Sequence, residues 1–129
     1  MATEILVNDG GAPARIYPFV AGSTITAGDV LMFAADGNVD PSTDDVEPAF
    51  GVALTDAATG AICNVVSGRG IILRVKQNTN LAAGQICMVD SGNAGEVIAH
   101  TGTAAATKFP ICMTLEDVGA GELVKVMLH

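Results

Sequence analysis

The sequence predicts a mainly β protein, a small pseudo-duplicated β-barrel or sandwich preceded by an extended N-terminal arm. Three observations predict this fold class. Short apolar runs alternate with small-residue turns along the chain. The 129 residues include 15 Gly and 5 Pro, which suit many tight turns better than long helices. One stretch of the chain also returns as a second copy, and the whole is long enough for one domain with a real core.

The repeat is clearest in Phe50–Val66, where two apolar runs flank a turn through Asp56 and Gly60. Glycine at the turn accommodates a positive φ, so the two runs read as a hairpin or tight corner. The same order returns between Ile111 and Leu128. At a constant offset, the matched pairs are Leu54 with Leu115, Asp56 with Asp117, Gly60 with Gly121, Ile62 with Leu123, and Val65 with Val126.

The repeat extends upstream, because Ala27–Met32 matches Ala83–Met88. Between the copies, Gly70–Lys76 alternates apolar and polar residues and is expected to form a half-buried joining strand. Two copies are too few for a solenoid, which favours a barrel or sandwich. The predicted parts are an arm over 1–25 and a body over 26–129, the body containing the related units 26–67 and 81–128.

The N-terminal arm contains two extended apolar segments separated by a Gly- and Pro-containing break at 8–13. Pro18 excludes the second segment from a central position in a sheet. An apolar arm outside the core suits addition to the sheet of another chain. The alternative is that the arm forms the first edge strand of its own domain, and the sequence does not separate the two.

Within the body, Val30–Ala34 predicts a buried strand, and the acidic stretch Asp36–Glu47 predicts a loop. Acidic and polar residues in this loop fall at calcium-ligand spacings. Pro41, however, occupies the position where an EF-hand needs Gly, and no flanking helices are predicted. A solvated loop is therefore the preferred interpretation, and no metal site is predicted.

Composition excludes several functional classes. The net charge of −8 argues against binding nucleic acid, which requires a basic surface, and against docking on anionic membranes. No apolar run approaches the ~20 residues of a membrane span, and the N-terminus lacks a secretory pattern, so synthesis in the cytoplasm is expected. The three cysteines, Cys63, Cys87 and Cys112, lie inside apolar runs and are expected to be buried and free.

No residue pattern predicts catalysis or a bound cofactor. His100 and His129 lie far apart and outside any motif, and no nucleotide, hydrolase or metalloprotease motif is present. Biotinyl and lipoyl carrier domains are also small duplicated barrels, but their modified lysine projects from a hairpin tip. Lys125 lies in the middle of a predicted strand, which disfavours the carrier interpretation.

With the repeat described, the chain resembles the small capsid cement or decoration proteins of tailed bacteriophages over about residues 25–128. The arm departs from the compact pattern of that family. The matching stretches are Ala27–Val30, Phe50–Ala58 with Gly60, Ala83–Gln85, and Gly121–Val126.

The resemblance implies a structural virion protein on the outer capsid surface, a homotrimer that bridges and stabilises subunits of the major capsid protein. The alternatives are a head-fibre or tail accessory protein, or a self-assembling β adhesion module. On the cement interpretation the arm contacts the capsid or a neighbouring protomer. The residues expected to make that contact are Glu4, Ile5, Leu6, Val7, Arg15, Ile16, Tyr17, Pro18, Phe19 and Val20.

Overall fold

The computed structural model describes residues 5–8, 16–43, 49–100 and 110–128, and in them the mainly β prediction is confirmed. These residues form no α-helix; their one helical element is the short 3-10 turn η1 (Ala35–Gly37). The strands are β1 (Leu6–Asn8), β2 (Ile16–Val20), β3 (Val30–Phe33), β4 (Val39–Pro41), β5 (Gly51–Ala53), β6 (Ile62–Val66), β7 (Ile72–Gln77), β8 (Ile86–Val89), β9 (Glu96–Ala99), β10 (Pro110–Thr114) and β11 (Val124–Leu128).

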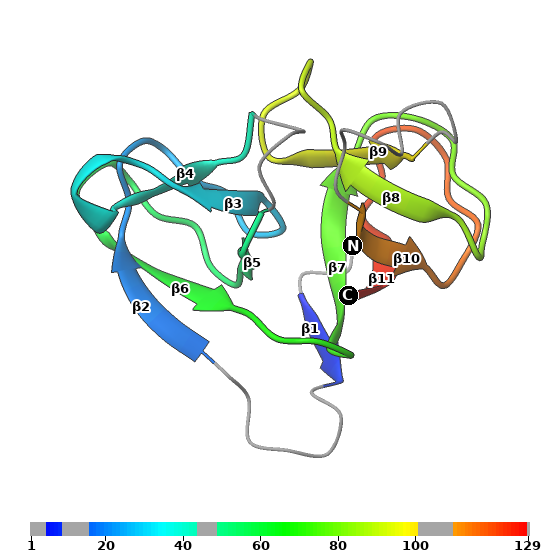
Figure 1. Ribbon diagram of the computed structural model, residues 1–129, viewed down its shortest axis with the longest axis horizontal. Coiled ribbons are helices and arrows are strands. Elements are labelled where there is room, and N and C mark those ends of the chain that lie inside the picture. Colours follow the sequence, from blue (N-terminus) through cyan, green and yellow to red (C-terminus); the bar gives the residue numbers. More distant parts are fainter. Residues whose placement is uncertain (1–4, 9–15, 44–48, 101–109, 129) are drawn as a thin grey trace.

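The strands form two sheets that lie side by side (Figure 1). In the C-terminal sheet the strand order is β7-β11-β10-β8-β9, and a parallel pairing of β9 with β7 closes it into a five-stranded barrel. We call this the C-barrel. The small strand β1 adds to the free side of β7.

The N-terminal sheet has the corresponding order β2-β6-β5-β3-β4. A parallel bridge between Ala21 and Val39 brings its two ends together, at the place where β7 and β9 pair in the other sheet. We call this sheet the N-barrel. Its strands β2 to β6 correspond one by one, and in the same order, to strands β7 to β11 of the C-barrel.

The correspondence holds at the level of residue pairs. Tyr17 faces Val65 as Leu73 faces Val126, so β2 and β7 occupy the same place in the two ladders. The turns agree as well: Asp56 accepts a hydrogen bond from the Ala27 N–H at 2.7 Å, and Asp117 accepts one from the Ala83 N–H at 2.7 Å. The structural repeat therefore begins at β2, upstream of residue 26, and the joining strand is the first strand of the second copy.

Alternation along the strands divides the apolar residues between two buried clusters. One fills the N-barrel with aliphatic side chains such as Leu31, Ala53 and Val65. The other fills the C-barrel and also includes Val30, Val52 and Val66, which point outward from the N-barrel. These three outward-facing residues of the N-barrel are thus packed against the C-barrel, and the C-barrel cluster extends across the contact between the barrels.

Candidate interaction surface

Four of the chain's aromatic residues gather at one open end of the N-barrel. The chain has one Tyr and four Phe, and Tyr17, Phe19, Phe33 and Phe50 form this group, which we call the aromatic mouth. The rings of Phe33 and Phe50 stack with centroids 4.1 Å apart, and Phe19 meets both edge-on at 5.3 and 5.4 Å. Such geometries are the favourable ones for aromatic pairs.

Strand alternation explains why the rings of Tyr17, Phe19 and Phe33 point to the same side of the sheet. Tyr17 and Phe19 lie opposite Val65 and Cys63, which point into the N-barrel, and Phe33 lies opposite the buried Val39. The inner rings pack on the barrel core, whereas the outer ones remain in solvent: Tyr17 is 47% exposed and Phe33 54%. A contiguous exposed apolar group of this kind is typical of a protein-binding surface.

The free edge of β2 borders the aromatic mouth. Ala21 donates its N–H to the Ala61 carbonyl, toward β6. Because hydrogen-bonded and non-hydrogen-bonded pairs alternate along an antiparallel ladder, Pro18 directs its backbone to the opposite, free edge. The corresponding residue of the C-barrel, Arg74, uses its N–H to bind the Ile5 carbonyl of the β1 segment at 2.8 Å. Proline has no such donor, so the β2 edge is protected against an added strand like β1.

A charged contact joins the two barrels. The Lys76 Nζ of β7 lies 2.9 Å from Oδ1 of Asp29, whose side chain is only 4% exposed. The other carboxylate oxygen accepts hydrogen bonds from the N–H and hydroxyl of Thr26. The Lys76 backbone N–H also donates to the Gly28 carbonyl at 3.0 Å. This backbone hydrogen bond and the ion pair therefore stabilise the same junction between the barrels.

Replacing Lys76 with Met is expected to lower the free energy of unfolding by about 2 kcal/mol, because the substitution leaves the Asp29 carboxylate buried without its cation. The loss is smaller than the about 3–5 kcal/mol of a fully buried pair, since the Lys76 side chain is 35% exposed. Urea unfolding measures it. The double variant Lys76→Met/Asp29→Asn should recover more than half of the loss; a single-variant loss below about 0.5 kcal/mol would show that the pair adds little.

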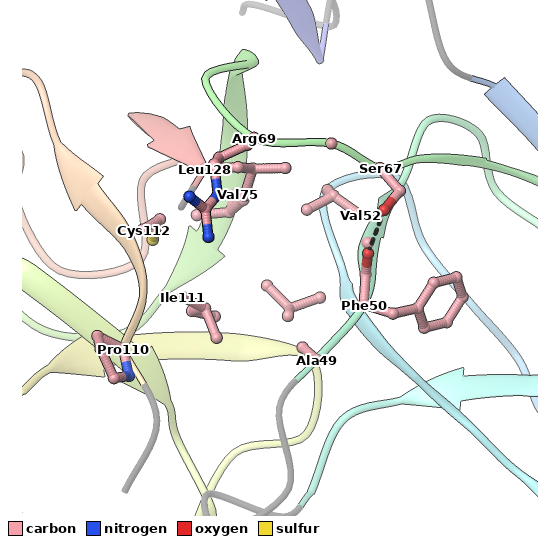
Figure 2. A pocket seen from close by; sticks show the side chains of 13 residues that line it. Ala49, Phe50, Val52, Ser67, Arg69, Val75, Pro110, Ile111, Cys112 and Leu128 are labelled. Carbon is pink, nitrogen blue, oxygen red and sulfur yellow. Dashed lines mark hydrogen bonds between the residues drawn. The ribbon is translucent and has the colours of Figure 1, made fainter.

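A cleft of about 270 Å³ lies between the barrels. Val52 lines one side and Val75, Ile111 and Leu128 the other (Figure 2), and Val30 is also among the lining residues. The Phe50 ring points away from the C-barrel residues and toward the aromatic mouth, and the Ser67 hydroxyl donates to the Phe50 carbonyl. The described lining is apolar apart from a few groups such as Arg69, and these residues form no set of catalytic side chains, so the cleft belongs to the joint between the barrels.

No protein-family model matches the chain, and no curated protein does either. Among solved structures, the chain is similar to the N base of the head fiber gp8.5 of bacteriophage phi29, with a TM-score of 0.69 and 15% sequence identity. The similarity covers 88% of this chain and 92% of that one. At this identity it establishes a shared fold, and because it covers nearly the whole of both chains, that fold includes both barrels.

The predicted contact residues fall into three groups. Glu4 and Arg15 lie outside the described residues. Ile5 is 3% exposed and packs with Leu6 in the C-barrel core, while Val7 is exposed on β1. The segment 16–20 forms β2 and pairs with β6 of its own chain, as the edge-strand alternative expects, and it keeps Ile16, Tyr17 and Val20 exposed. Their role in contacting a partner stays a prediction.

The other residues singled out in the sequence lie as follows. Cys63, Cys87 and Cys112 are free and buried. Burial raises the pKa of the Cys63 thiol, with a further contribution from the Asp29 carboxylate, which keeps the thiol protonated. Within the described ranges no three His, Cys, Asp or Glu side chains are placed to hold a metal ion, and no helix is long and apolar enough to cross a membrane.

The acidic loop is described only in part, because residues 44–48 lie outside the described ranges. Its first residue, Asp36, adopts a φ of 60° in η1, a conformation that Asp tolerates better than most residues. Asp40 lies in β4 and accepts a hydrogen bond from the Ser23 hydroxyl at 3.0 Å. Asp40 therefore has a local structural role.

Proposed function

We propose that this chain is a structural, non-enzymatic protein of a bacteriophage virion that binds the outer surface of the head through the major capsid protein. The observation that carries the proposal is the pair of barrels shared with the phi29 head fiber base over 88% of the chain. The family resemblance of the turn and strand motifs supports it independently, because it rests on residues rather than on the fold. The aromatic mouth adds an exposed protein-binding surface.

Within this role we favour cementing: a homotrimer that bridges neighbouring capsid subunits. Rotational symmetry would let several weak contacts act together, so that avidity replaces the affinity of any single contact. Among the described residues, Val7 on β1 is the best candidate for a capsid contact, because it is exposed and belongs to neither buried cluster.

The second candidate is the base of a head fibre, which the similarity to the phi29 protein favours directly. A cement protein and a fibre base both bind the head, but only cement must hold capsid subunits together. The temperature at which heads break open therefore separates the two functions.

The test mixes the purified chain with empty heads of the phage that encodes it, followed by sedimentation and heating. We expect co-sedimentation at a fixed ratio to capsid protein, and a rise of several degrees in the disruption temperature if the chain cements. Binding with no such rise would favour the fibre base, and absence of binding would contradict both.

The variant Val7→Glu should weaken head binding at least tenfold, because a charge would be buried at an apolar contact. Ala58→Glu places the same charge on an exposed turn and is the matched control. Deleting residues 1–20 is a poor test, since it removes β2 from the N-barrel ladder.

A further inference from the structure

Two surfaces meet in the contact between the barrels, and each has a corresponding, exposed surface on the other barrel of the same chain. One side of the contact is a row of three outward-facing N-barrel residues on neighbouring strands, Val30, Val52 and Val66, which we call the N-row. All three are buried and belong to the C-barrel core cluster. The N-row therefore acts as a plug against the C-barrel.

The other side of the contact is the end of the C-barrel that corresponds to the aromatic mouth. By strand register, Tyr17 and Phe19 correspond to Leu73 and Val75. All the corresponding side chains are aliphatic and buried in the cluster that contains the N-row, namely Leu73, Val75, Val89 and Ile111. The same end of a barrel is thus covered in one copy and open in the other.

The counterpart of the N-row on the C-barrel is Ile86, Met113 and Met127, which we call the C-row. These residues pair across β8, β10 and β11 as the N-row pairs across β3, β5 and β6. Unlike the N-row, they have no covering element among the described residues: Ile86 is 41% and Met127 39% exposed. Met113 and Met127 also line a shallow groove with Arg69. The described part of the chain therefore carries one exposed plug and one exposed mouth.

A backbone hydrogen bond that joins the barrels also has counterparts on the two exposed surfaces. Inside the chain, the Lys76 N–H donates to the Gly28 carbonyl. The counterparts are the Val20 N–H, which faces the free edge of β2 by the same alternation as Pro18, and the Gly84 carbonyl. A Cβ on Gly28 would meet Leu123 of the C-barrel at 3.2 Å, whereas one on Gly84 would meet nothing within 4 Å. The surface around Gly28 is therefore covered by the other barrel, and the corresponding surface around Gly84 is open.

We propose that a second copy of this chain seats its C-row on the aromatic mouth, repeating between chains the contact that joins the barrels within one chain. The two surfaces differ, so the contact runs head to tail, and such contacts close into rings when the rotation allows. Methionine suits the plug, because its flexible thioether packs well on aromatic rings. This interface concerns copies of the chain only, and it stands whether or not phage heads are the target.

Two charge substitutions test the interface, one on each surface. Met127→Glu disables the plug and Phe33→Glu disables the mouth, and both side chains are exposed, so folding should be preserved. Native mass spectrometry and sedimentation should show one discrete ring for the wild type and for the Ala58→Glu control. Each interface variant alone should be a monomer, its association weakened at least 100-fold by the desolvation of the new charge.

Mixing the two variants gives the sharpest result. The Phe33→Glu chain keeps an intact C-row and the Met127→Glu chain keeps an intact mouth, so an equal mixture should form 1:1 dimers and nothing larger. A wild-type monomer, a variant that still forms the ring, or a mixture that stays monomeric would each overturn the proposal. Circular dichroism and thermal unfolding confirm that each variant is folded before it is scored.

Because Val7 lies outside both surfaces, Val7→Glu should keep the ring while losing head binding. Failure of the interface and failure of the proposed phage role are therefore distinguishable.

Discussion

Replacing Gly51 with Ala is expected to be among the most damaging single substitutions, lowering the free energy of unfolding by about 3 kcal/mol. Gly51 is buried at the start of β5. An added Cβ would lie 2.6 Å from a Val65 methyl and 2.8 Å from the Val66 carbonyl oxygen. Val65 could relieve its contact only by changing its χ1 rotamer, and the carbonyl belongs to the β5–β6 ladder and cannot move without disturbing it.

Gly119→Ala is the matched control, because its Cβ would meet nothing closer than 3.9 Å and its φ is not positive. We expect a change within about 0.5 kcal/mol there. Urea unfolding of both variants measures the difference. Equal stability of the two would mean that β5 and β6 are farther apart in solution than in the structure.

Gly51 also connects stability with the proposed interface. It lies between Phe50 of the aromatic mouth and Val52 of the N-row, so a shift of β5 displaces both sides of the barrel wall. The two surfaces are thus fixed by one strand, and their relative placement depends on the tight β5–β6 contact.

The turns of the fold were predictable from sequence because each turn requires particular residue types at fixed positions. Asp56 and Asp117 each accept a backbone N–H from the earlier loop that precedes β3 or β8, and a positive-φ glycine four residues after each Asp closes its turn. These requirements leave the same residues at the same spacing in both copies. The repeat was therefore visible wherever the turn demanded a particular residue type.

The first strand of each copy was not recognisable in this way. Strand positions require only an apolar residue of suitable size, and Tyr17 and Pro18 of β2 share nothing with Leu73 and Arg74 of β7. The equivalence of β2 and β7 becomes visible only when β2 is paired with β6 and β7 with β11, and these pairings join residues far apart in the sequence. The repeat visible in the sequence therefore begins at residue 26, whereas the structural repeat begins at β2, inside the predicted arm.

The aromatic mouth was missed for the same reason. Alternation places Tyr17 and Phe19 on one side of an extended segment, and that signal was available in the sequence. The contributions of Phe33 and Phe50 depend on which strands are neighbours, in the order β2-β6-β5-β3. Periodicity within one strand does not contain that order.

Replacing Gly95 with Ala should also cost about 3 kcal/mol or more, since two separate penalties combine there. Gly95 has a φ of +79°, in the left-handed region that costs other residues about 1–2 kcal/mol. An added Cβ would also lie 2.5 Å from Oδ1 and 2.8 Å from Cγ of Asp29, the buried carboxylate of the inter-barrel ion pair.

Gly121→Ala separates the penalties, because Gly121 has a φ of +85° but open space around its Cβ position. We expect Gly121→Ala to cost about 1 kcal/mol by thermal unfolding, the backbone part alone. The remaining loss in Gly95→Ala then measures the displacement of Asp29 from Lys76. In a Lys76→Met background, the part of the Gly95→Ala loss that exceeds the Gly121→Ala loss should shrink, because the ion pair is already broken. If that part is unchanged, the clash acts on packing and leaves the ion pair intact.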